Sequence, residues 1–200
     1  VLEKAEQLAK TYDSYIKYIK LSPMYISILS NSMQNLLNES RKALLEHEKG
    51  KELMYNEQHS TFGNTDNLFI ANEFEIYWTD VTGLECKSMI DRIIIDHENK
   101  KVVLIDLKTT SHLPDFKDKF TEYKYYRQMS FYWMAIQWYF KNTLKDKRFD
   151  EYVKETYVVA ISTKDPTEVK VFEITERTLV NGLVEIIPLF ELLSWHFKED

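Results

Sequence analysis

The chain has 200 residues, of which 44% are hydrophobic and 14% aromatic, and its formal net charge is −6. This much apolar material can form the core of one domain, so we expect a single domain over residues 1–200. The acidic balance argues against a general nucleic-acid-coating protein, although a local basic strip is enough to hold DNA. A single cysteine, Cys86, excludes an internal disulfide framework and favours the cytoplasm. No uncharged apolar run reaches the ~18 residues of a membrane span, so no membrane contact is expected.

The N-terminal part, over about residues 1–50, is predicted to be helical. Tyrosines and isoleucines recur at helical spacing within residues 1–20. The pair Ser22-Pro23 is typical of an N-cap followed by the first helical position, and the second helix should run to about His47. The polar residues 56–67 are expected to form the longest loop.

Two apolar segments with many β-branched residues, 88–95 and 102–108, are typical of buried strands. The polar bridge between them is short enough to fold the strands into an antiparallel hairpin. Residues 72–78 precede them as a further strand. The hairpin would bring acidic residues of the two strands together.

These acidic residues are the most informative feature of the chain. Side chains alternate along a strand, so Asp106 and Lys108 should share one face about 7 Å apart, and Asp91 should share its face with Ile93. Two neighbouring carboxylates repel each other unless a cation compensates, and hard oxygen ligands favour Mg²⁺ or Mn²⁺. A lysine beside them could orient the attacking water or offset transition-state charge in phosphodiester cleavage. The alternative is a solvated strand end, because Asp-x-Lys is common by chance.

A long helical pattern follows over about residues 117–142. Gln128 and Tyr132 stand four apart on one face, with Tyr125 one turn earlier. Such an aromatic helix is more often core than site, but a glutamine on its apolar face needs hydrogen-bond partners. The helix also carries a basic strip that either contacts DNA phosphates or is simply the solvated face of the helix. The strip is made of Lys117, Lys119, Lys124 and Arg127.

The last quarter of the chain predicts two strands, 157–162 and 170–174, and a closing helix over 176–196. Thr175 should cap this helix, and Pro188 should kink or interrupt it. The element order is then helices, three strands, a long helix, two strands and a helix. This order predicts an α/β fold with a mixed central sheet flanked by helices.

Taken together, the motifs resemble one known family. They are Trp78 and residues 82–87 ahead of Ile90-Asp91, then residues 105–110, and then residues 125–128 with Tyr132. This series, over roughly residues 72–140, resembles the PD-(D/E)XK nuclease superfamily, in particular its RecB-like and RecE-like (exonuclease VIII) phage-type exonucleases. The resemblance implies a restriction-endonuclease-like core over residues 70–200.

Site residues follow from the same resemblance. It implies that the metal is held by Asp91, Asp106 and the carbonyl of Leu107, and that Lys108 is the catalytic lysine. Gln128 and Tyr132 would contact the site or the DNA. Glu73 lies where the family tends to keep an acid on the preceding strand, with Glu75 on the same face, and a solvated glutamate is the alternative for both. RecB-like members usually add a metal-binding histidine upstream, for which His47 is the best candidate, although its charged surroundings are typical of an exposed helix end.

The implied activity is Mg²⁺- or Mn²⁺-dependent exonuclease cleavage of linear double-stranded DNA, 5′ to 3′, in phage-type recombination. A single-strand annealing protein as partner, a ring-shaped homo-oligomer and the cytoplasm of a bacterial or phage-infected cell are implied as well. One alternative is another RecB-like nuclease acting on single strands. Such nucleases generally carry cysteines for an iron–sulfur cluster, which Cys86 alone cannot hold. The other is a non-catalytic DNA- or protein-binding module that keeps the nuclease fold.

Overall fold

The computed structural model of the chain describes residues 30–55 and 67–199. Its contacts divide the chain into two units, residues 1–35 and residues 36–200, and the fold below is that of the second unit. The predicted helix over residues 1–20 and most of the predicted loop over 56–67 lie outside the described residues. The assignment of one domain to residues 1–200 stays a prediction.

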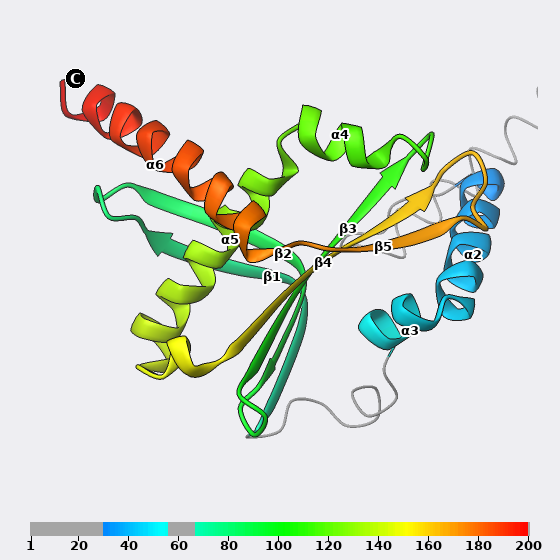
Figure 1. Cartoon of the computed structure of the whole chain (residues 1–200), viewed down its shortest axis with the longest axis horizontal. Coiled ribbons are helices and arrows are strands. Elements are labelled where there is room, and N and C mark those ends of the chain that lie inside the picture. The colour runs from blue at the N-terminus through cyan, green and yellow to red at the C-terminus, as the bar shows by residue number, and fades with distance from the viewer. Residues whose placement is uncertain (1–29, 56–66, 200) are drawn as a thin grey trace, which may run out of the picture. The chain divides into compact units, whose positions relative to one another are not determined.

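In the described part of the chain, five strands form one sheet in sequential order (Figure 1). Neighbouring strands are antiparallel except for the parallel central pair β3 and β4, so the sheet is mixed as predicted. The parallel pair is connected by helices, because a parallel crossover needs a long connection. The strands are β1 (Leu68–Thr79), β2 (Glu85–Asp96), β3 (Lys101–Thr110), β4 (Val153–Ser162) and β5 (Val169–Glu173).

Both faces of the central strands are buried, which explains their continuous apolar sequences. On one face, Val102 and Leu104 of β3 pack in the larger hydrophobic cluster with Met129 and Ile136. We call this side the α5 face, because helix α5 (Tyr125–Tyr139) covers it. On the other side, the α3 face, Val103 and Ile105 pack with leucines of α2 (Asn31–Glu46) and α3 (Glu48–Tyr55). Described helices therefore flank both faces of the sheet.

The predicted helix over 117–142 is wrong at its N-terminal part, where the structure has two helices. Helix α4 (Phe116–Glu122) ends at Tyr123, and α5 begins after Lys124, whose backbone is left-handed with φ 55° and ψ 39°. A left-handed residue stops a right-handed helix and turns the chain. A π-helical turn, Phe140–Leu144, follows α5. The break gives α4 and α5 different directions over the sheet.

Helix α6 (Glu176–Glu199) closes the fold and packs on α5. Thr175 caps its start as predicted, since the Thr178 amide donates to Thr175 Oγ1 at 3.4 Å. The helix continues past Pro188, so the predicted interruption is absent. By length and composition alone, Glu176–Phe197 could cross a membrane, and 22% of its apolar segment is buried in the fold. One such helix is only weak evidence for a membrane span. The absence of membrane contact stays a prediction.

Candidate functional site

The predicted hairpin of β2 and β3 is confirmed, and it opens at the two acids. Backbone pairing runs from Asp96 opposite Lys101 to Arg92 opposite Ile105 and goes no further. At the next position Asp91 Oδ2 accepts a hydrogen bond from the Leu107 amide at 2.7 Å. A carboxylate thus takes the place of a backbone acceptor, and Asp91 is tied to the residue after Asp106.

Side-chain alternation along β2 is interrupted at the same point. Ile90 and Ile93 are three residues apart, yet both are fully buried in the cluster on the α5 face. The regular alternation assumed for β2 therefore fails at Asp91, although Asp91 lies close enough to Asp106 of the α5 face to raise its pKa. Glu73 of β1 lies across from this point, outside the pairing, with a left-handed φ of 48°. Such bulge-like irregularities re-aim side chains and are common beside active sites.

Asp106 and Lys108 share the α5 face of β3, as predicted. The Asp106 side chain is only 1% exposed. Lys108 Nζ donates to its Oδ1 at 2.8 Å. The ammonium is also 2.7 Å from Oδ2, but the described residues make no hydrogen bond to that oxygen. Burial raises the pKa of Asp106 to about 6, Asp91 adds to this, and Lys108 opposes it.

A divalent cation fits this arrangement. The buried Oδ2 of Asp106 lacks a hydrogen-bond partner in the described part of the chain. The neighbouring carboxylate of Asp91 also raises the pKa of Asp106. A hard cation would satisfy that oxygen and offset the repulsion. Within residues 30–55 and 67–199, no three His, Cys, Asp or Glu side chains are placed to hold a metal ion together. Further ligands would then be backbone or water oxygens, and a role for the Leu107 carbonyl stays a prediction.

Helix α5 adds polar and aromatic groups to the acids. Gln128 Nε2 donates to the Tyr132 hydroxyl at 2.8 Å, so the half-buried glutamine has the partner it needs. Burial raises the pKa of Tyr132, and Asp106 and Asp91 raise it further, so this hydroxyl lies near both carboxylates. Lys108 Nζ lies 5.1 Å from the ring centre of Tyr125, a cation–π contact. The structure therefore brings Gln128, Tyr132 and Tyr125 to the acids.

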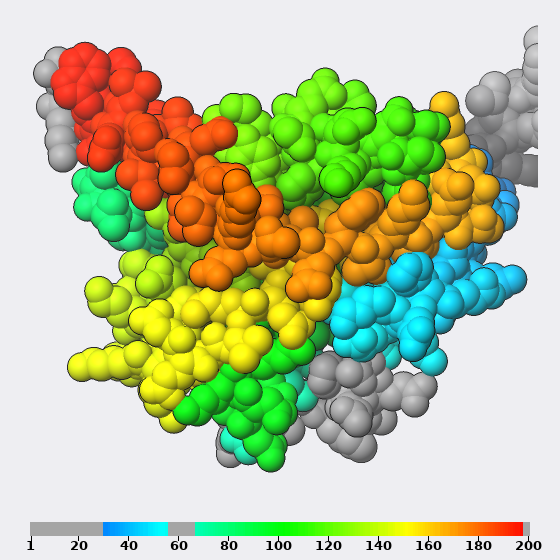
Figure 2. All heavy atoms as spheres, viewed as in Figure 1, coloured from blue at the N-terminus to red at the C-terminus, as the bar shows by residue number. Residues whose placement is uncertain are grey.

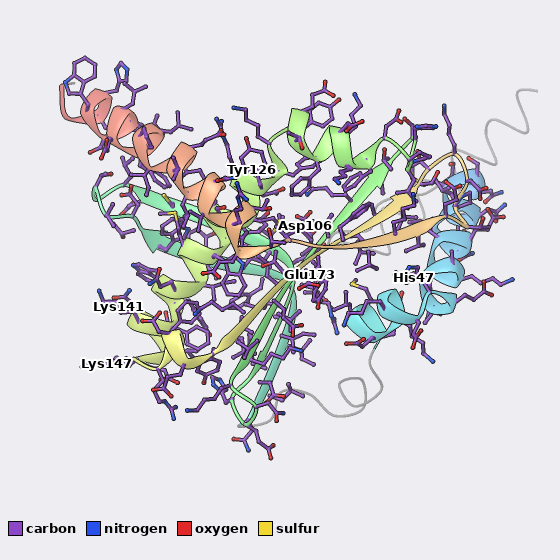
Figure 3. All side chains as sticks on the ribbon, viewed as in Figure 1. His47, Asp106, Tyr126, Lys141, Lys147 and Glu173 are labelled. Atoms are coloured by element: carbon purple, nitrogen blue, oxygen red, sulfur yellow. The ribbon has the colours of Figure 1, made fainter. Side chains whose placement is uncertain are left out.

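His47 is not brought to the acids. It lies between α2 and α3, where its Nδ1 accepts a hydrogen bond from the Gly50 amide at 3.1 Å. The leucines of these helices pack on the α3 face, whereas Asp106 lies on the α5 face, and Figure 3 shows His47 and Asp106 well apart. His59 lies outside the described residues. Glu73 is exposed, and its catalytic role stays a prediction, while the neighbouring Glu75 pairs with Lys87 at 2.7 Å.

Two cations of the predicted basic strip, Lys124 and Arg127, are paired with one acid that the sequence did not reveal. Glu185 of α6 accepts from Tyr126 Oη at 2.8 Å, Lys124 Nζ at 3.1 Å and Arg127 Nε at 2.6 Å. These donors hold the pKa of Glu185 well below its usual range. No local signal could reveal this cluster, because 58 residues separate Arg127 from Glu185. DNA contact by Lys117, Lys124 and Arg127 stays a prediction.

The family of the chain follows from comparison with known proteins. The family model described as "PDDEXK-like domain of unknown function (DUF3799)" matches residues 17–199. No curated protein matches. A crystal structure of a candidate exonuclease from Eubacterium rectale superposes with a TM-score of 0.53 and 13% identity, over 95% of this chain and 67% of that chain, which supports the fold. The structure named SSO0001 reaches 0.36 and 18% over 90% and 69%, too low to carry an argument. The chain therefore belongs to this PDDEXK-like family within the PD-(D/E)XK nuclease superfamily, with a restriction-endonuclease-like α/β fold.

Proposed function

We propose that this chain is a Mg²⁺- or Mn²⁺-dependent deoxyribonuclease whose site is built from Asp91, Asp106 and Lys108. The observation that carries the proposal is the buried Asp106 carboxylate, with one oxygen that has no hydrogen-bond partner in the described residues. It lies beside the Lys108 ammonium and near a second carboxylate. Burying this carboxylate is costly even with Lys108 beside it, which favours a functional role over a structural one.

Each side chain has a role in phosphodiester hydrolysis. A bound divalent metal would supply Lewis-acid activation of the phosphate and of the attacking water. Asp91 and Asp106 hold that metal, with the Leu107 carbonyl as a backbone ligand. Lys108, held by Asp106 at 2.8 Å, orients the water or offsets charge on the pentacovalent transition state. Gln128 and Tyr132 present a hydrogen-bonded pair toward the same point, and Glu73 is the further candidate acid.

We also propose the substrate and the setting. The substrate is linear double-stranded DNA, degraded from its ends 5′ to 3′ in phage-type recombination, in the cytoplasm of a bacterial or phage-infected cell. A single-strand annealing protein would take over the tails, and the enzyme would act as a ring-shaped homo-oligomer. The RecE-like motif series supports these points, as does the likeness to a candidate exonuclease. Lys117 supports DNA contact, because its ammonium has no carboxylate partner among the described residues.

The substrate proposal is tested with duplexes labelled at the 5′ or the 3′ end, in Mg²⁺ or Mn²⁺. Short labelled products should come first from the 5′ label, and closed circular duplex should stay intact. Cleavage of circles at the same rate would contradict end dependence, and earlier release of the 3′ label would reverse the proposed polarity.

Two alternatives have distinct outcomes in the same assay. A RecB-like nuclease acting on single strands would degrade labelled single-stranded DNA faster than the duplex. A binding module that keeps the fold would retain the labelled duplex uncut at every metal concentration. The observation that favours the module is that the structure places none of its described histidines in a cluster with the two acids.

A further inference from the structure

A groove of about 880 Å³ lies between α4, β5 and the first turns of α6. In Figure 2 these segments adjoin on the face in view, α4 in green and the others in orange. The groove is lined by the rings of Phe116, Phe120, Tyr126 and Phe172 and by Thr178 and Asn181 of α6. Two acids, Glu173 and the paired Glu185, also line it. Its volume is in the range of small-molecule sites, and aromatic lining with a few polar groups is typical of them.

The groove lies in line with the proposed active site. Asp106 pairs with Val158, and Val158 pairs with Phe172, so Asp106 and Phe172 occupy one row across the sheet and point to the same face. Two strand spacings separate them, about 10 Å. The ring of Phe116 stacks on Phe172 with centroids 5.2 Å apart and on Tyr125 at 6.3 Å. Tyr125 in turn lies under Lys108, so aromatic contacts connect the groove to the catalytic lysine.

Two ammonium groups accompany this aromatic surface. Lys170 belongs to the row Lys108, Ala160, Lys170, so it lies on the same face of the sheet and two residues from Phe172. Lys117 lines the groove from the first turn of α4. Both lysines are exposed, and the described residues pair neither ammonium with a carboxylate. Lys124 differs from both, because its ammonium is paired with the Glu185 carboxylate at 3.1 Å.

We infer that this groove binds an unpaired nucleotide of the DNA substrate, with its base stacked against Phe120 and Phe172 and neighbouring phosphates at Lys117 and Lys170. The inference rests on the proposed nuclease function and adds a subsite to it. Aromatic rings stack on any base, and free ammonium groups attract the backbone. The distance of about 10 Å from Asp106 corresponds to about three stacked nucleotides at 3.4 Å each, so the bound nucleotide lies close to the scissile bond.

The test uses a 12-nucleotide oligodeoxythymidine with one 2-aminopurine, in the full chain carrying Asp106→Asn so that binding is measured without cleavage. Stacking in the groove quenches the 2-aminopurine fluorescence. Lys117→Ala with Lys170→Ala should weaken binding several-fold. It should also reduce the slope of log K against log salt concentration by about 1.4, because each phosphate contact to a single strand contributes about 0.7. Phe120→Leu should relieve the quenching and weaken binding roughly 5- to 100-fold. Lys141→Ala with Lys147→Ala is the matched control, since Figure 3 shows both lysines far from Asp106.

The outcomes separate the groove from the nuclease activity. Unchanged binding, salt slope and quenching in the Lys117/Lys170 variant would overturn the inference, and so would equal losses in the Lys141/Lys147 control. If a thermal melt shows that Phe120→Leu unfolds the chain, the Lys117/Lys170 variant alone tests the groove. Cleavage by the parent chain together with neutral groove variants would refute only the groove. No cleavage by the parent chain, together with groove-dependent oligonucleotide binding, would refute the proposed nuclease and leave a single-strand binding groove.

Discussion

Asp106 is held in the metal-free protein at a cost in stability. Its carboxyl is 1% exposed, and burial raises its pKa from the ordinary 3.8 to about 6. The native state therefore binds this proton more tightly than the unfolded chain does. The stabilisation from the protonated form is fully present below about pH 4 and is lost as the pH rises through about 6.

Asp106→Asn should therefore stabilise the metal-free protein at pH 7. The shift corresponds to a gain on the order of 3 kcal/mol above pH 6 that fades toward pH 4, because asparagine cannot ionise. Urea unfolding in EDTA at pH 4 and pH 7 measures it, and Asp150→Asn, at an exposed position, is the control. An equal effect of Asp106→Asn at both pH values would show that ionisation of this carboxyl is not the cause.

At the scale of elements, the crossing of α5 and α6 depends on Gly182. A Cβ at this position would lie 2.6 Å from the Tyr126 carbonyl oxygen, and closer still to the Ser130 hydroxyl. That hydroxyl is itself engaged, 2.7 Å from the Leu179 carbonyl oxygen. The two helices can therefore come this close only with glycine at the crossing.

Gly182→Ala should lower the free energy of unfolding by about 1–3 kcal/mol, even though alanine favours helices, because the close-packed crossing must open. Val180→Ala, at a half-exposed position two residues before Gly182, is the matched variant and should have a small effect. Chemical denaturation of both variants measures the difference. A stabilising Gly182→Ala would mean that helix propensity outweighs the contact.

Regular local structure is predictable from this sequence, whereas features that depend on tertiary packing are not. Asp106 and Lys108 were placed correctly because β3 alternates regularly along its length. The interruption of β2 at Asp91 could not be predicted, because it lies opposite Glu73 of β1, whose left-handed backbone has no local signal in the sequence. The left-handed Lys124 was not predictable either, since lysine has no local preference for that conformation. The Glu185 cluster depends on tertiary packing over 58 residues or more.

On the scale of the whole molecule, α6 is the surface best suited to the proposed assembly. Its α5-facing side is covered, but its other sides expose large apolar residues, including Val184, Ile187, Leu192, Trp195 and Phe197 at 41 to 72%. Contiguous apolar surface of this kind commonly marks an interface. A second copy of α6 would offer the same apolar side chains to it.

Leu192→Glu with Trp195→Glu should lower the mass in solution to that of a single chain. Light scattering behind size-exclusion chromatography measures this, and Val153→Glu, exposed on β4, is the control that should leave the mass unchanged. A wild-type chain that is already single at high concentration would contradict the ring. An oligomer that survives both glutamates would place the interface elsewhere.

The central claim is that Asp106 and Lys108 form a metal-dependent phosphodiesterase site, and the initial rate of cleavage of end-labelled linear duplex tests it most directly. The rate should depend on Mg²⁺ or Mn²⁺ and vanish in EDTA. It should fall at least 100-fold in Asp106→Asn and in Lys108→Met, because each removes a group acting on the transition state, and stay unchanged in Lys147→Ala. Metal-independent cleavage, or cleavage that survives both active-site substitutions, would contradict the claim.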